Sequence, residues 1–214
     1  RQLQCLDEQR RARSADAVHD LLLRLGPLTP AEVTARCVAS SDVLGWLKAL
    51  EAAGRTLRLK VAGEERVAAV EDAPRLRDGL KLALPEGIAA GLLKPVADPL
   101  GDLVLRYART HGPFTEAELQ PRLGAPTREL EPVLRRLVVS AKLLDGAFRP
   151  GGSGRELCDP EVLRQLRSRS LARLRAEVEP VPAAVLGRHL VHWHGLHQRR
   201  RGLDAVLDAV DAAL

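Results

Sequence analysis

The sequence predicts a mainly α-helical protein with small β-hairpin wings, built from tandem winged-helix (helix-turn-helix) modules followed by a helical extension. The pattern Gly-Pro, an apolar residue and Thr occurs twice between stretches of helical apolar spacing, at residues 26–29 and 112–115. In both copies a glutamate follows the threonine three residues later, which is the Thr-x-x-Glu capping box of a helix start. Two copies of this pattern indicate a repeated three-helix unit. Apolar residues make up 45% of the chain and aromatic residues only 2%, so we expect a core of Leu, Val and Ala, which suits helices.

The first module is expected over residues 1–80. Ser14 is a good N-cap for its first helix, and Thr29 with Glu32 begins the second helix. A third helix is expected over residues 41–53, where Gly54 ends it. The side chains expected to be buried on this third helix are Val43, Leu44, Trp46, Leu47 and Leu50.

A β-hairpin is predicted to complete the first module. Leu57, Leu59 and Val61 alternate with Arg58 and Lys60, which is the two-residue period of a strand with one buried face. Residues 62–64 are expected to form the turn and residues 66–70 the returning strand. This hairpin would be the wing of the module.

Residues 81–98 are predicted to be a linker or a packing segment, and residues 99–150 the second module. Its first helix begins near Asp98, Thr115 and Glu118 begin the second, and the third covers about residues 126–140. Its wing is expected to be minimal, with a turn at Asp145-Gly146 between residues 143–144 and 147–148. The side chains expected to point inward from the third helix are Leu130, Val133, Leu134, Leu137 and Val138.

Residues 151–214 are expected to form an Arg-rich helix and a C-terminal helical extension. The glycines of residues 149–154 predict a flexible loop, and Asp159 begins a helix that continues to about residue 178. Residues 181–196 are interpreted as an irregular stretch and residues 203–214 as a last helix, and the chain is interpreted as a piece of a longer protein. The apolar stripe expected on the Arg-rich helix consists of Val162, Leu163, Leu166, Leu171 and Leu174.

Charge and cysteine content narrow the class of partner. The net charge is +5 and the sequence pI is about 9.5, which favours a polyanion such as nucleic acid. Cys5, Cys37 and Cys158 are widely spaced and odd in number, so neither a disulfide framework nor a structural zinc site is expected. The sequence contains no apolar run long enough for a membrane span. A reducing cytoplasm fits these features.

Basic residues in three places are candidates for DNA contact: the third helix of the second module and the residues just after it, the Arg-rich helix, and residues 199–201. The third helix of a winged helix enters the major groove, and phosphate contact needs cations. In the first module this helix exposes Asp42, Lys48 and Glu51, which is nearly neutral, so a packing role is favoured there. Arginines of the later helix present planar donors that suit phosphate, although a solvated helix face is the alternative. The candidate DNA-binding residues are Arg128, Arg135, Arg136, Lys142, Arg164, Arg167, Arg169, Arg173, Arg199, Arg200 and Arg201.

Other polar groups are given structural roles. His189, His192, His194 and His197 fall within nine residues of one stretch, whereas zinc sites prefer mixed ligands on separate elements, so no metal site is predicted. The glycines of residues 151–154 are interpreted as a hinge rather than a phosphate cradle. Trp46 and Trp193 are expected in the core. The acidic residues of the last helix, explained most simply as a solvated face, are Asp204, Asp208 and Asp211.

Ordered motifs along most of the chain resemble those of one family, the large helicase-related (Lhr) family of bacterial ATP-dependent DNA helicases. Upstream similarities lie at residues 10–16, 25–29 and 62–66. Two positions depart from the family pattern as we expect it: Leu157 stands in place of a tryptophan, and residues 189–194 are unusually rich in histidine. The later motifs are Arg106-Tyr-Ala-Arg-Thr-His-Gly-Pro-Phe-Thr115, Phe148-Arg-Pro-Gly-Gly-Ser-Gly154, Cys158-Asp-Pro-Glu-Val-Leu163, Arg169-Ser-Leu-Ala-Arg-Leu-Arg175, Glu177-Val-Glu-Pro180 and Arg201-Gly-Leu-Asp204.

The resemblance implies a winged-helix region outside the two motor domains. No Walker A motif and no D-E-x-H box is present, so this segment is expected to be non-catalytic and to have no cofactor of its own, with ATP and Mg²⁺ acting at the motor domains. The implied partners are single-stranded or junction DNA, the motor domains of the same chain and, as a further option, a second copy of the chain. The family also implies a bacterial cytoplasmic, nucleoid-associated protein. Three alternatives stay open: part of an AlkZ-like DNA glycosylase acting on uracil or a damaged base, an oligomerisation scaffold without DNA contact, and a transcription regulator.

Overall fold

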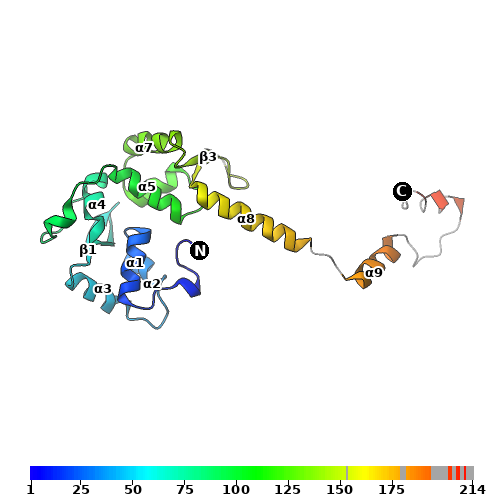
Figure 1. Ribbon diagram of the computed structural model, residues 1–214, viewed down its shortest axis with the longest axis horizontal. Helices are drawn as coiled ribbons and strands as arrows, with labels where there is room; N and C mark the ends of the chain where they lie inside the picture. Colours follow the sequence, from blue (N-terminus) through cyan, green and yellow to red (C-terminus); the bar gives the residue numbers. More distant parts are fainter. Residues whose placement is uncertain (153, 179–181, 194–201, 204–205, 208–209, 211–214) are drawn as a thin grey trace. The chain divides into compact units, whose positions relative to one another are not determined.

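The computed structural model describes residues 1–214 except 153, 179–181, 194–201, 204–205, 208–209 and 211–214. Its contacts divide the chain into two units, residues 1–167 and residues 168–214, which are described separately. The first unit contains the order of three helices followed by a two-stranded hairpin twice (Figure 1). We call these the first repeat (residues 15–69) and the second repeat (residues 99–158).

The first repeat begins as the sequence predicts. Helix α1 (Ala15–Leu25) is capped by the Ser14 hydroxyl, which accepts a hydrogen bond from the Ala17 amide at 3.2 Å. Helix α2 (Pro30–Thr34) has both hydrogen bonds of the capping box, Thr29 N to Glu32 Oε2 at 2.9 Å and Glu32 N to Thr29 Oγ1 at 3.2 Å. These bonds satisfy amide donors that have no partner inside the helix. The predicted helix starts are therefore confirmed.

Helix α3 (Val43–Ala52) buries one narrow face. Val43, Leu47 and Leu50 lie at helical spacing on the buried side, and Trp46 packs against the same core. The expected burial of Leu44 is wrong, because its side chain is 64% exposed. Leu44 is displaced from the buried stripe toward exposed Lys48, since consecutive positions on a helix are about 100° apart.

The first hairpin matches the prediction. Strand β1 (Thr56–Val61) pairs antiparallel with β2 (Glu64–Ala69), in a register from Thr56 opposite Ala69 to Val61 opposite Glu64. The turn between them has positive φ at Ala62 (51°) and Gly63 (85°). The alternation of apolar and charged residues places the apolar side chains of β1 inside.

The chain between the repeats is packed rather than extended. The 3₁₀ turn η2 (Val70–Asp72) leads into α4 (Ala73–Leu80), which lies against α5 (Pro99–Thr110) of the second repeat. Residues 81–98 contain a further 3₁₀ turn, η3 (Ala90–Leu93), and apolar side chains of this segment lie on the same core. One hydrophobic core thus includes β1, β2, α4 and the second repeat, while another fills the first repeat around α1 and α3.

The second repeat also starts as predicted. Asp98 caps α5 by accepting from the Gly101 amide at 3.2 Å, and Thr115 with Glu118 forms the capping box of α6 (Glu116–Leu123). Helix α7 (Thr127–Val139) comes next and buries Leu130, Leu134 and Leu137, with Val133 and Val138 packed at the edge of the core.

The second wing differs from the prediction. Strand β3 (Leu144–Gly146) pairs with β4 (Glu156–Cys158), so Asp145 and Gly146 lie in a strand and the expected two-residue turn is wrong. The buried carboxylate of Glu156 explains the long connection. It accepts hydrogen bonds from the amides of Phe148 (2.7 Å) and Arg149 (2.9 Å), which holds these two residues beside β4. The second wing is therefore a hairpin of β3 and β4 with a longer connection than the predicted two-residue turn.

Helix α8 (Pro160–Glu177) begins where expected, because Asp159 accepts hydrogen bonds from the amides of Glu161 (2.9 Å) and Val162 (3.1 Å). Its predicted apolar stripe is only partly right. Val162 and Leu163 are buried, but Leu166, Leu171 and Leu174 are exposed. The helix packs through its first turn, where its side chains lie with Phe148 and Leu3.

Residues 181–196, interpreted as irregular, contain helix α9 (Ala183–Trp193), so that interpretation is wrong for most of the stretch. The local sequence allows this because Pro182 precedes the helix and no proline interrupts it. The predicted last helix, residues 203–214, lies largely outside the described residues. Across the described part of the chain, no helix has the length and apolar character needed to span a membrane.

Candidate nucleic-acid interface

The candidate cations of the second repeat differ in their partners. Arg128 is exposed on the first turn of α7, and no ion pair involves it within the described residues. Arg135 is exposed too, but its Nη2 lies 2.6 Å from Glu131 Oε1, one helical turn away. An exposed pair of this kind is worth only about 0.3–0.5 kcal/mol, so a phosphate can compete for Arg135. The two arginines lie seven residues apart on one helix, as the sequence indicates.

Arg136 has a structural role that the sequence does not show. Its two Nη atoms donate to the two carboxylate oxygens of Asp98 at 2.7 and 2.8 Å. This fork holds α7 against the start of α5, because Asp98 is the N-cap of α5. The hydrogen bonds from Arg136 lower the pKa of Asp98, against an opposing effect of burial. Lys142 is exposed beyond the end of α7 and adds a further positive charge near Asp98.

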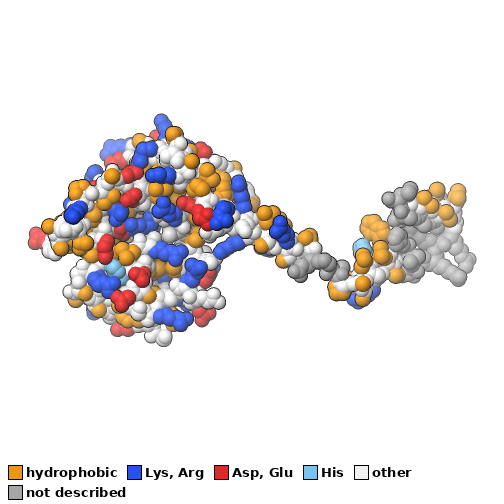
Figure 2. Space-filling view, in the orientation of Figure 1, with side chains coloured by type: hydrophobic (Ala, Val, Ile, Leu, Met, Phe, Trp, Pro, Cys, Tyr) orange, Lys and Arg blue, Asp and Glu red, His pale blue; other side chains and the backbone are white. Residues whose placement is uncertain are grey.

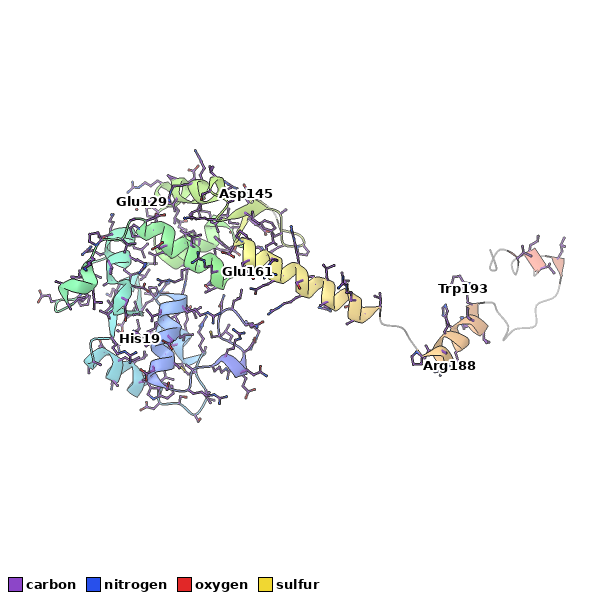
Figure 3. All side chains as sticks on the ribbon, viewed as in Figure 1. His19, Glu129, Asp145, Glu161, Arg188 and Trp193 are labelled. Atoms are coloured by element: carbon purple, nitrogen blue, oxygen red, sulfur yellow. The ribbon has the colours of Figure 1, made fainter. Side chains whose placement is uncertain are left out.

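The candidate arginines of α8 are exposed along the helix, and two of them pair with glutamates of the same helix, one of which is Glu161 (labelled in Figure 3). Arg164 donates to Glu161 at 2.7 and 2.8 Å, which lowers the pKa of Glu161 to about 2, and Arg173 Nε lies 3.1 Å from Glu177 Oε1. Arg167 is exposed without an ion pair in the described residues, and Arg169 is exposed as well. Arg199, Arg200 and Arg201 lie outside the described residues.

A polar pocket of about 410 Å³ lies between the two repeats. Arg122 of α6 spans it, donating to both carboxylate oxygens of Glu32 (2.8 and 3.0 Å) and to the Pro27 carbonyl (3.0 Å). His111 stacks on Tyr107 with ring centroids 3.7 Å apart. Burial lowers the pKa of His111 to about 4, so its imidazole is neutral at pH 7 and its Nδ1–H donates to the Tyr107 carbonyl at 2.9 Å.

Two carboxylates that line this pocket, Glu32 and Glu118, have lowered pKa values and accept hydrogen bonds. Burial acts to raise the pKa of Glu32, but the Thr29 amide and the charge of Arg122 hold it below its ordinary value. Hydrogen bonds from Arg149, and then from the Thr115 amide, lower the pKa of Glu118 to about 2. A general base needs a pKa near the working pH, so these two groups are poorly suited to activate water.

The histidine stretch gives no metal cluster in the part that the structure describes. His189 and His192 lie on α9, His194 and His197 fall outside the described residues, and the described residues contain no group of three potential metal ligands. The core position expected for Trp193 is wrong: its side chain is 64% exposed at the end of α9 (Figure 3). The acidic residues of the last helix, Asp204, Asp208 and Asp211, also lie outside the described residues.

Comparison with known proteins identifies the first part of the chain. Residues 1–95 match the family model of the winged-helix domain of the large helicase-related protein. The resemblance to the Lhr family is confirmed. The chain is 44% identical over 211 residues to the Lhr helicase/probable uracil glycosylase of Mycolicibacterium smegmatis, a match that covers 98% of this chain and 14% of that protein. It is 34% identical over 196 residues to the Lhr helicase/uracil glycosylase of Escherichia coli, which covers 91% of this chain and 12% of that protein.

The chain therefore spans only a small part of the Lhr helicases that it matches. The matched winged-helix domain contains the first repeat, α4 and the adjoining segment as far as residue 95. The residues that join this domain to the second repeat, above all Arg122 and His111, are not predicted from the sequence. The capping box at Thr115 locates α6, but nothing local to Arg122 signals a partner 90 positions earlier in the chain.

Proposed function

We propose that this chain is a DNA-binding segment of an Lhr-type DNA repair helicase, in which two winged-helix modules hold single-stranded or junction DNA for motor domains elsewhere in the protein. The match of residues 1–95 to the Lhr winged-helix domain carries this proposal, since winged helices are DNA-binding folds. The second repeat has the same order of three helices and a hairpin, which supports a second module of the same type. The ATP and Mg²⁺ of such a helicase would act at the motor domains.

The exposed cations support DNA as the partner. Arg128 and Arg167 are solvent-exposed and have no ion pair in the described residues, so phosphate contact would cost them no existing bond. Arg135, Arg164 and Arg173 form only short-range pairs on a helix surface. We place the protein in the bacterial cytoplasm, associated with the nucleoid, as expected of a DNA helicase.

Fluorescence anisotropy on labelled single-stranded, duplex and forked DNA tests the proposal. We expect binding at 50 mM salt that weakens steeply at 200 mM, because each neutralised phosphate releases counterions. At 50 mM salt, the chain with Arg167 and Arg173 replaced by Ala should bind DNA more weakly than the unmodified chain. No binding to any of the three substrates at 50 mM salt would overturn the proposal and leave a packing or oligomerisation module.

Base excision is the second candidate, because both relatives carry uracil glycosylase in their names. The lowered pKa values of Glu32 and Glu118 in the pocket between the repeats make these two groups poor general bases, which favours binding over excision within this chain. To test for excision, uracil-containing DNA is incubated with this chain alone and then treated with alkali, which cleaves the strand where a base has been removed. Cleavage above the background of a heat-inactivated sample would assign the excision activity to this segment.

A further inference from the structure

A groove of about 750 Å³ lies where α1 ends beside α4 and α5, and Lys142, just beyond the end of α7, also lines it. We call it the α1–α5 groove. The Arg106 side chain lies against the turn at the end of α1, since a Cβ built on Gly26 would be 3.6 Å from its Nη1. The groove is therefore formed by elements of both repeats. Its lining residues are Leu23, Arg24, Arg75, Asp102, Leu105, Arg106, Arg109, Thr110 and Lys142.

Two of its arginines are fixed by carboxylates and shape the floor. Arg106 forms a fork with Asp72, whose side chain is only 1% exposed, and Arg75 Nε lies 3.1 Å from Asp102 Oδ2. These pairs hold α4 and α5 together beneath the groove. Their charges largely cancel, so the net charge of the groove comes from its other cations.

Three further cations lie at the groove with little or no compensation. Arg24 and Lys142 are exposed and form no ion pair in the described residues. Arg109 is exposed, with a loose contact of 3.9 Å to Asp159. The five cations of the groove with the paired carboxylates of Asp72, Asp102 and Asp159 leave a net charge of +2. Figure 2 shows Lys and Arg side chains over the face of this unit on which α1 and α5 are drawn.

The groove also presents apolar surface between these charges. Leu23 is 37% exposed there, and Leu105 contributes a smaller area from α5. A duplex offers phosphates but keeps its bases stacked inside, whereas a single strand offers phosphates together with sugar and base faces. Cations around an apolar floor fit the single strand better.

Resting on the proposed function, we infer that the α1–α5 groove is the site that holds the backbone of single-stranded DNA. Arg24, Arg109 and Lys142 contact successive phosphates, and Leu23 contacts sugar and base surface. These contacts are to phosphate and to the apolar faces of sugar and base, so binding is independent of sequence. The third helix of the second repeat, with Arg128 and Arg135, is then secondary for this ligand.

The salt dependence of DNA binding sets how much affinity the removal of these phosphate contacts should cost. Each phosphate contact on a single strand contributes about 0.7 to the slope of log K against log salt concentration. Losing three contacts therefore lowers the slope by about 2, and affinity at 0.1 M salt by about 100-fold if the electrostatic part vanishes near 1 M. A contact of Leu23 with sugar and base surface contributes no such slope.

The experiment compares five forms of the chain on a labelled oligothymidine, by anisotropy from 50 to 400 mM salt. The groove variant combines Arg24→Ala, Arg109→Ala and Lys142→Ala. A matched control combines Arg10→Ala, Arg13→Ala and Lys48→Ala, which removes three exposed cations that do not line the groove. The third form is Leu23→Gln, and the fourth is the unmodified chain. Thermal denaturation of each form shows that it is folded.

We expect the groove variant to lose about two units of slope and the control less than one. Leu23→Gln should bind several-fold more weakly to the single strand with an unchanged slope, and equally well to duplex DNA. Equal losses in the groove variant and the control would overturn the groove while leaving DNA binding in place. An unmodified chain that binds no DNA would instead overturn the proposed function. A fifth form, with Arg128→Ala and Arg135→Ala, should keep most of the slope; a loss restricted to this form would overturn the groove and assign the site to α7.

Discussion

The contact between the end of α6 and the first hairpin predicts a difference between two glycines. Gly124 ends α6 and Gly54 lies just beyond α3, and both have a φ of +67°. A Cβ on Gly124 would lie 2.9 Å from the backbone nitrogen and 3.3 Å from the Cβ of Ala62, in the turn of the first hairpin. A Cβ on Gly54 would meet no atom within 4 Å. The pair thus separates the cost of the left-handed conformation from the cost of the contact between repeats.

Each Gly→Ala change costs about 1 kcal/mol for placing a side chain at positive φ. Only Gly124→Ala must also displace backbone, which adds about 1–3 kcal/mol, as overpacking does elsewhere. We therefore expect the free energy of unfolding to fall by about 1 kcal/mol for Gly54→Ala and by about 2–4 kcal/mol for Gly124→Ala. Urea denaturation followed by circular dichroism at 222 nm measures both. Equal losses would refute the close packing of α6 against the first hairpin.

Three further predictions concern stability, pH and the separation of structural from binding arginines. Arg106→Ala leaves the buried Asp72 carboxylate without its main partner and should lower the free energy of unfolding by about 3–5 kcal/mol. Arg109→Ala, three residues further along α5, should change it by less than about 0.5 kcal/mol. A loss below about 1 kcal/mol for Arg106→Ala in urea denaturation would contradict the buried pair. His111, which faces Arg122, Arg36 and Glu32, has a pKa of about 4 against 6.5 unfolded, so the unfolded chain binds more protons between these values. The contribution of His111 to the free energy of unfolding should therefore be fully present above pH 6.5 and fall by about 3 kcal/mol toward pH 4. His111→Gln should remove that part of the fall. Identical pH profiles for the unmodified chain and His111→Gln would argue against burial of the neutral ring. Arg136→Ala, which loses the fork to Asp98, should lower the melting temperature with little effect on DNA affinity, while Arg128→Ala should leave the melting temperature unchanged and weaken the binding of duplex rather than single-stranded DNA; calorimetry and anisotropy on the same samples decide, and a shared effect would remove the distinction.

Local signals in the sequence predict the helix starts well. Ser14, Thr29, Thr115 and Asp159 act within three residues of themselves, so their side chains determine where α1, α2, α6 and α8 begin. The first hairpin is predictable for the same reason, because its alternation is read along one strand. The second wing is not, since its shape depends on the Glu156 carboxylate reaching back to the amides of Phe148 and Arg149.

The candidate site is predicted less well, because the availability of a cation depends on distant partners. Arg136 counts as a candidate by its place on α7, yet Asp98, 38 residues earlier, occupies it. Arg24 and Arg109 are not among the residues that the sequence predicts to bind DNA, since α1 carries one arginine and α5 only two. Only the packing of α1 beside α5 brings them to one groove. Spacing on one helix cannot report a surface that two repeats form together.

Photo-crosslinking tests the proposed binding of DNA most directly, because it shows both that DNA is bound and where. The unmodified chain is irradiated with a single-stranded oligonucleotide that carries a photoreactive group on its backbone phosphates, and the crosslinked peptides are mapped by mass spectrometry. We expect crosslinks concentrated in α1 and α5 that disappear at high salt. Crosslinks absent from both helices, or none anywhere at 50 mM salt, would contradict single-strand binding in the α1–α5 groove.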